Sequence, residues 1–195
     1  MASPDHRKIL QCFAVVLLAV ASGDAVAPYA VLADACLPEE TREAQAPDPG
    51  RRVLTGHLAR RFMIAPEATE LMVETAYRAA AEVGLDPLLV LAVIAIESRF
   101  NPIAESVMGA KGLMQIIPRY HRAKLELHGG EGAVLDPESN ILVGARILQE
   151  YVHRTGTLEA GLQYYNGAFR DGSAQYAHKV MAERGRLEQV LRGGT

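Results

Sequence analysis

The sequence predicts a mainly α-helical domain, and three observations support this fold class. Apolar residues recur with the three- and four-residue spacing of a buried helix face in several segments of residues 66–191. Aspartate–proline pairs precede two of these segments, and proline is favoured at the first position of a helix. No stretch alternates apolar and polar residues over the length of a convincing β-strand. We therefore expect about six or seven helices.

The first 27 residues have the order of parts found in a secretory signal peptide. His6-Arg7-Lys8 precedes an apolar run from Ile9 to Ala21, and Ala25-Val26-Ala27 forms a small-x-small cleavage site. A membrane anchor is the alternative, but this run is too short to cross a hydrocarbon core of about 30 Å. We expect cleavage after Ala27, export, and no stable membrane span in the processed chain.

Residues 28–65 are expected to be a linker. Four prolines and five acidic residues lie between positions 28 and 49, and no helix or strand period runs through them. Residues 51–63 allow a helix, but their apolar pattern is weak. We therefore expect the folded domain at residues 66–195.

Capping residues mark the first two helices of that domain. Pro66 opens a helix with acidic residues in its first turn, where negative charge suits the helix dipole, and Gly84 ends it. Asp86-Pro87 then begins a second helix. Its residues 88–96 are nine apolar residues in a row, which is typical of a short helix buried on every side.

The second half of the domain is also expected to be helical. Residues 101–112 contain proline and two glycines and are expected to form a loop, followed by a short helix at 113–117. A long helix begins at Asp136-Pro137, and a further one covers residues 157–165. Ser173 is expected to cap a last helix that runs through Met181.

Composition and motifs exclude several classes of function. The net charge of −3 gives no basic footprint, so nucleic acid is not an expected partner. The histidines form no HExxH pattern, and no glycine-rich phosphate loop or nucleophile elbow is present. No metal or cofactor is therefore expected.

Glu97 is the one residue of the apolar helix that packing does not explain. A carboxyl group at the end of an apolar run is desolvated, which disfavours the anion and raises its pKa. Such a group stays protonated near neutral pH and can act as a general acid. From position alone, however, the sequence favours a helix-end carboxylate that reaches solvent or pairs with Arg99.

The residues around and after Glu97 favour a catalytic role. The motifs, in chain order, are ESRFNP at 97–102, Ser106, GAKGLMQIIP at 109–118, DPESNI at 136–141 and YYN at 164–166. Each motif alone is weak, but in this order and spacing they resemble the catalytic domain of soluble lytic transglycosylases, bacterial relatives of goose-type lysozyme. The resemblance covers about half of the chain, residues 85–180.

This resemblance implies a lysozyme-like helical fold with a groove for peptidoglycan glycan strands. The expected signal peptide places such an enzyme in the periplasm. It makes Glu97 the catalytic residue. It also implies five substrate-binding residues: Ser106, Met114, Gln115, Tyr165 and Asn166. Met114 is equally explained as a core residue, and Ser98 either pins the helix end or contacts substrate. A secretion or conjugation apparatus is a further candidate partner.

Two departures from the family pattern affect the groove. Tyr164 replaces the usual small residue before the tyrosine of the Ala-Tyr-Asn motif. Residues 167–172 differ from the turn that typically follows that motif. We therefore expect substrate preference on this side of the groove to differ from the family pattern.

Most glycosidases use two carboxylates, and the sequence offers one good candidate. Asp86 and Asp136 have the positions of helix caps, and Asp171 lies in a loop. A lone acid suffices if the 6-hydroxyl of N-acetylmuramic acid attacks its own anomeric carbon, which leaves a 1,6-anhydro end. The alternatives are a hydrolytic muramidase assisted by Asp171 or Asp136, and a module that binds glycan strands without cutting them.

Overall fold

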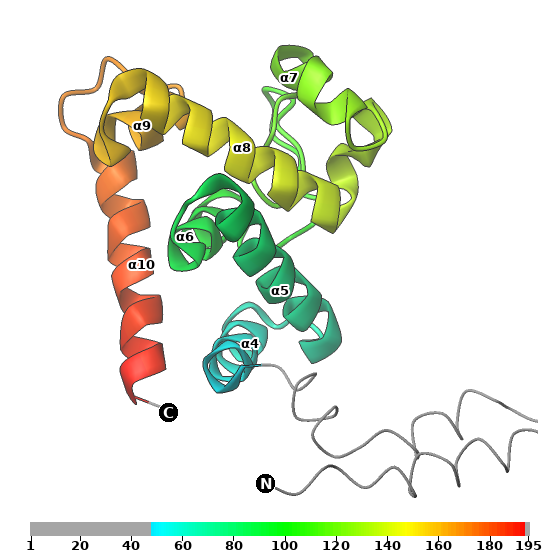
Figure 1. Cartoon of the computed structure of the whole chain (residues 1–195), viewed down its shortest axis with the longest axis vertical. Helices are drawn as coiled ribbons and strands as arrows, with labels where there is room; N and C mark the ends of the chain where they lie inside the picture. The colour runs from blue at the N-terminus through cyan, green and yellow to red at the C-terminus, as the bar shows by residue number, and fades with distance from the viewer. Residues whose placement is uncertain (1–47, 194–195) are drawn as a thin grey trace, which may run out of the picture. The chain divides into compact units, whose positions relative to one another are not determined.

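Seven α-helices and one 3₁₀ helix make up residues 48–193, the part of the chain that the computed structural model describes (Figure 1). No strand is present among these residues, so the predicted mainly helical fold is confirmed. In chain order the elements are α4 (Pro49–Phe62), α5 (Pro66–Val83), α6 (Pro87–Glu97), α7 (Pro118–Glu126), η1 (Glu131–Leu135), α8 (Pro137–Thr155), α9 (Leu158–Tyr165) and α10 (Gln175–Gly193).

The apolar helix α6 forms the centre of the core. Its residues 88–95 are all buried, and α5 and α10 pack against it (Figure 1). The Asp86 side chain accepts a hydrogen bond from the backbone N–H of Leu88, and this cap and the following proline begin the helix as expected. The apolar run thus ends at the surface of the core, and it carries Glu97 there.

Helix α4 belongs to the folded domain, and this corrects the expected boundary at residue 66. Leu54 and Leu58 are fully buried in the main core, and Arg61 makes a bidentate ion pair with Glu183 of α10. Burial favours the neutral form of Glu183, but hydrogen bonds from Arg61 and Arg186 outweigh this effect and lower its pKa. The expected signal peptide and residues 28–47 of the expected linker lie outside the described residues.

Two shorter predictions were wrong. Residues 113–117 form a turn instead of a helix, closed by paired backbone hydrogen bonds between Lys111 and Ile116. Pro118 therefore begins α7 where we expected it to end a helix. The last helix begins at Gln175, beyond the expected cap, and continues twelve residues past Met181 to Gly193.

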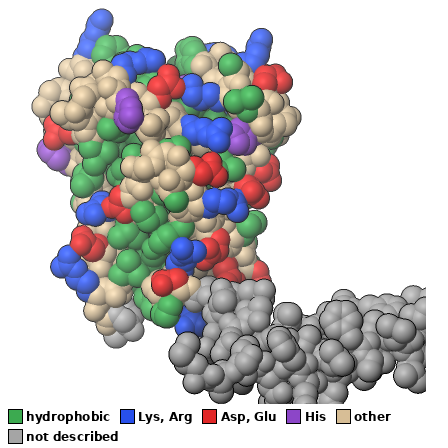
Figure 2. All heavy atoms as spheres, viewed as in Figure 1, with side chains coloured by type: hydrophobic (Ala, Val, Ile, Leu, Met, Phe, Trp, Pro, Cys, Tyr) green, Lys and Arg blue, Asp and Glu red, His purple; other side chains and the backbone are tan. Residues whose placement is uncertain are grey.

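Charged side chains of both signs are interspersed over the face seen in Figure 2, in keeping with the small net charge. Within residues 48–193, no helix combines the length and the apolar character that crossing a membrane requires.

Candidate active site

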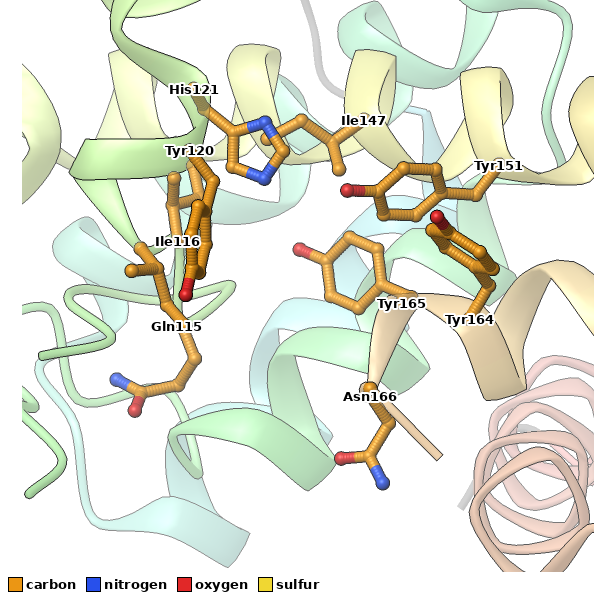
Figure 3. A pocket seen from close by; sticks show the side chains of 11 residues that line it. Gln115, Ile116, Tyr120, His121, Ile147, Tyr151, Tyr164, Tyr165 and Asn166 are labelled. Carbon is orange, nitrogen blue, oxygen red and sulfur yellow. The ribbon is translucent and has the colours of Figure 1, made fainter. Parts of the chain in front are cut away.

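Three clefts adjoin one another through shared lining residues, and together they are called the groove. The Glu97 cleft, of about 300 Å³, is lined by Ile96, Glu97, Asn166, Ala168, Asp171, Gln175, Tyr176 and Lys179. The tyrosine cleft, of about 210 Å³, is lined by Gln115, Ile116, Ile117, Tyr120, His121, Ile147, Tyr151, Tyr164, Tyr165, Asn166 and Gly167 (Figure 3). The loop cleft is lined by Met108, Gly109, Lys111, Ile117, Pro118, Arg119 and Glu131. Asn166 joins the first two clefts, and Ile117 joins the second and third.

The end of α6 is held in place by its own backbone and by Ser98. The Ser98 hydroxyl donates to the carbonyl oxygen of Ile94 at 3.2 Å, and its side chain is buried. Arg99 and Phe100 both have positive φ angles, which turn the chain sharply away from the helix axis. Ser98 therefore pins the helix end, and Glu97 is the polar residue of this segment that lines a cleft.

Burial raises the pKa of the Glu97 carboxyl, and a hydrogen bond from Tyr176 partly opposes this rise. The Tyr176 hydroxyl donates to Oε1 of Glu97 at 2.5 Å. Burial and the nearby carboxylate raise the pKa of Tyr176 well above its usual value, so it stays a neutral donor. No ion pair with Glu97 forms among residues 48–193, so the alternative of pairing with Arg99 is not realised.

Sequence reasoning missed Tyr176. It stands in the first turn of α10, next to buried Ala177 and four residues before buried Val180, so its position is typical of a core residue. The residue that it contacts is 79 positions away in the chain. Only the packing of α10 against α6 reveals the pair.

Gln115 and Ser106 hold the loop that precedes α7. The Gln115 amide donates to the carbonyl oxygens of Ala104 and Gly112 at 3.1 and 3.0 Å. The Ser106 hydroxyl accepts from the backbone N–H of Ala110 at 3.0 Å. Gln115 lines the tyrosine cleft, and its side-chain oxygen accepts no hydrogen bond from the part of the chain that the structure describes. Ser106 lines none of the three clefts.

The Met114 side chain is fully buried, which favours the core alternative over substrate contact. It packs so closely on Gly144 of α8 that a Cβ there would come within 2.5 Å of the Met114 sulfur. Its backbone N–H donates to Oδ1 of Asn140 at 2.7 Å. The amide of Asn140, also fully buried, donates to the carbonyl oxygens of Lys111 and Val134. Asn140 thus ties the turn that carries Gln115 to α8.

Tyr165 links α9 to the same turn. Its hydroxyl donates to the carbonyl oxygen of Met114 at 2.8 Å, and burial, with the Glu97 charge nearby, raises its pKa well above the usual value. Asn166 follows at the end of α9 and is exposed. The structure therefore brings Gln115, Tyr165 and Asn166 to one cleft, and Asn166 also to Glu97.

Comparison with known proteins identifies the family of this site. Residues 74–184, more than half of the chain, match the model of the Transglycosylase SLT domain. This chain belongs to that family. The chain is 38% identical over 113 residues to a transglycosylase of Enterobacteria phage PRD1, covering 55% of this chain and 41% of the phage protein. It is 41% identical over 105 residues to the soluble lytic murein transglycosylase of Escherichia coli K12, covering 51% of this chain and 16% of the relative.

A solved structure confirms the lysozyme-like fold. The described SLT domain is similar to an inactive mutant of lytic transglycosylase Slt from Pseudomonas aeruginosa, with a TM-score of 0.54 and 22% sequence identity. The match covers 61% of this chain and 24% of the larger protein. The chain thus spans less than half the length of each of these relatives.

The SLT domain offers one acidic residue near Glu97. Asp86 caps α6 and pairs with Arg184, and Asp136 caps α8 through the backbone N–H of Ser139 at 2.8 Å, so both have structural roles. Asp171 lines the Glu97 cleft and is exposed. Hydrogen bonds from the Ser173 hydroxyl and backbone N–H lower the pKa of Asp171, so it is a carboxylate at neutral pH.

Proposed function

We propose that this chain is a lytic transglycosylase that cleaves the bond between N-acetylmuramic acid and N-acetylglucosamine in peptidoglycan. The observation that carries the proposal is the environment of Glu97: a carboxyl group whose pKa burial raises, in a groove, at the end of the apolar helix of an SLT domain. The relatives of this domain are named as transglycosylases, which supports the same activity.

Glu97 acts first as an acid and then as a base. Tyr176 occupies Oε1, so the transferable proton lies on Oε2. This proton goes to the glycosidic oxygen as its bond to the anomeric carbon breaks. The 6-hydroxyl of N-acetylmuramic acid attacks that carbon and gives its proton to the Glu97 carboxylate. The products are a 1,6-anhydromuramyl end and a free 4-hydroxyl, and no water is consumed.

The remaining site residues position the strand. Gln115 and Asn166 offer polar groups to the sugars, and Tyr165 supports the cleft wall through its bond to Met114. Ser106 acts indirectly, by holding the loop that Gln115 also binds. Met114 contributes through its backbone carbonyl and not through its side chain.

Glu97→Gln tests the catalytic role, because the amide keeps the shape of the side chain but cannot give up a proton as an acid. We expect digestion of purified peptidoglycan to fall by at least about a hundredfold, the lower range for loss of general acid catalysis. Glu67→Gln, at an exposed position of α5, is the matched control and should keep full activity. Digestion by Glu97→Gln at the wild-type rate would refute the proposal. A wild-type protein that binds walls but releases no fragments would indicate a binding module.

Asp171 supports a second candidate function, a hydrolytic muramidase. An ionised carboxylate in the same cleft as Glu97 is the arrangement that could activate a water molecule. Mass spectrometry of the fragments separates the two functions, because hydrolytic products carry one more water than anhydro ends. Anhydro ends in wild-type digests that persist in digests by Asp171→Asn would support the lytic reaction. Their absence from wild-type digests would favour hydrolysis.

We propose further that the chain acts in the periplasm after cleavage behind Ala27. The proposal rests on the order of parts in the sequence, because these residues lie outside the described ones. N-terminal sequencing of the protein recovered from the cell envelope should begin at Pro28. An intact N-terminus in that fraction would instead indicate an anchor. A secretion or conjugation apparatus as partner stays a prediction of the sequence alone.

A further inference from the structure

The tyrosine cleft contains two polar side chains that the reaction at Glu97 does not use. His121 comes from α7 and Tyr151 from α8, and both face the hollow between these helices and α9 (Figure 3). Within residues 48–193, neither the His121 ring nor the Tyr151 hydroxyl makes a hydrogen bond to protein. Two half-buried groups are therefore available to a ligand in this cleft.

His121 is presented to the cleft by a break in its helix. Its backbone leaves helical geometry, with φ −128° and ψ 21°, within the first turns of α7. Burial lowers the pKa of His121, the nearby Lys124 lowers it further, and Glu150 opposes them. The imidazole is thus neutral at neutral pH and offers one donor and one acceptor.

Tyr151 is held in place by the residue that departs from the family pattern. The Tyr164 ring packs on the Tyr151 ring with centroids 4.6 Å apart. Arg154 lies over both rings at 5.6 Å and donates to the Tyr164 hydroxyl. The bulk of Tyr164 is therefore accommodated at the rim of the cleft, where it supports the wall that Tyr151 forms.

The chemistry of the cleft fits an uncharged sugar. Ile116 and Ile147 form an apolar surface, and the tyrosine rings add flat faces of the kind that pack on the C–H groups of a pyranose. Burial raises the pKa of Tyr151, so its hydroxyl stays neutral, as does His121. Neutral donors and acceptors suit hydroxyl and N-acetyl groups, and they give little compensation to the carboxylates of a peptide stem.

We propose that His121 and Tyr151 form a subsite that binds an N-acetylhexosamine ring of the glycan strand, away from the bond that is cut. The inference rests on the proposed function, because one glycan strand must occupy both the tyrosine cleft and the Glu97 cleft. The two clefts adjoin at exposed Asn166, which lines both. The subsite makes His121 and Tyr151 determinants of the strand length that the enzyme prefers.

Calorimetry with N-acetylglucosamine oligomers, from the disaccharide to the hexasaccharide, tests the subsite. In a Glu97→Gln background, binding is measured without turnover, so failure of the subsite is distinct from failure of the catalytic proposal. We expect affinity to rise with oligomer length. Adding His121→Ala or Tyr151→Phe should weaken the longest oligomers by about threefold to tenfold, the effect of one lost hydrogen bond, and leave the disaccharide unchanged.

His153→Ala is the matched control, because this exposed histidine of α8 lines none of the three clefts. It should bind every oligomer as the Glu97→Gln protein does. Tyr151→Phe keeps the ring that packs on Tyr164, so it remains decisive even if His121→Ala does not fold. The proposal would be overturned if Tyr151→Phe and a folded His121→Ala bound the longest oligomers with unchanged affinity. It would also be overturned if either variant lost the same affinity for oligomers of every length.

Discussion

Two opposing effects set the acidity of Glu97. Burial at the end of α6 favours the protonated form, and the hydrogen bond from Tyr176 favours the anion. In the proposed reaction Glu97 first gives and then takes back a proton, so both its protonated and its ionised form must be accessible. Tyr176 therefore tunes and orients the carboxyl group without exchanging the proton itself.

Replacing Tyr176 by phenylalanine should shift the pH profile of the reaction. Loss of the hydrogen bond removes stabilisation of the carboxylate, so the pKa of Glu97 rises further. The acid form then persists to higher pH, and the alkaline limb of the kcat/KM profile for peptidoglycan digestion shifts to higher pH. Tyr164→Phe, which removes a hydroxyl that does not touch Glu97, should leave the limb in place. A downward shift in Tyr176→Phe would contradict this account.

We also expect the ionised form of Glu97 to lower the free energy of unfolding at neutral and alkaline pH. Its pKa is higher in the folded than in the unfolded chain, so its favourable contribution is present below the unfolded pKa. That contribution is lost as pH rises through the folded pKa. Glu97→Gln should therefore raise the midpoint of urea unfolding at alkaline pH, with a gain that shrinks as the pH falls. An equal gain at all pH values would point to packing instead.

The sequence predicted Glu97 and not Tyr176 for a physical reason. A carboxyl group directly after nine apolar residues is unusual for a buried helix, and the sequence alone shows it. Tyr176 fits its local environment, and its role arises only where two distant helices meet. For Met114 the motif indicated a residue of the groove, but a motif does not say which way a side chain points. The Met114 side chain is buried against Gly144.

At the scale of elements, the turn at residues 111–116 depends on one side chain. Asn140 makes three hydrogen bonds to the backbone of that turn and of η1. These bonds replace those that a helix would make, which explains why the helix expected at 113–117 does not form. Two of the helices that did follow expectation, α6 and α8, begin at caps whose partners are only two or three residues away, at Asp86 and Asp136.

Asn140→Ala should lower the free energy of unfolding by about 2 to 4 kcal/mol, because it removes three hydrogen bonds, two of them to the buried backbone groups of Met114 and Val134. The turn that bears Gln115 would loosen, so peptidoglycan digestion should fall in the fraction that still folds. Denaturant titration measures the first effect and dye release from labelled walls the second. Gln189→Ala, at an exposed position of α10, should change neither appreciably. A fully stable Asn140→Ala would show that the turn is held by other contacts.

At the scale of the whole molecule, α4 completes the core. Its apolar residues are few and sit among arginines, so the sequence shows a weak pattern where the structure has a packed helix. The deciding contacts are with α5, the next helix, and with α10, which is far along the chain. Local periodicity therefore placed the domain boundary too late.

A fragment of residues 48–195 should unfold cooperatively, whereas a fragment of residues 66–195 should not. The shorter fragment exposes the core surface that Leu54 and Leu58 cover and leaves buried Glu183 without Arg61. Thermal melts followed by circular dichroism compare the two. A shorter fragment that melts as sharply and as high as the longer one would show that α4 is dispensable.

The meeting of α4 with α10 has a consequence for how this domain can be joined to others. A Cβ on Gly50 would lie 3.2 Å from the Leu191 side chain, so the chain enters and leaves the domain at nearly the same point. Tyr176 lies fifteen residues before Leu191 on α10, about 22 Å along the helix at 1.5 Å per residue. A larger protein could thus carry the domain as an insertion between two neighbouring positions of its own chain, with Tyr176 at the opposite end of α10 from the junction.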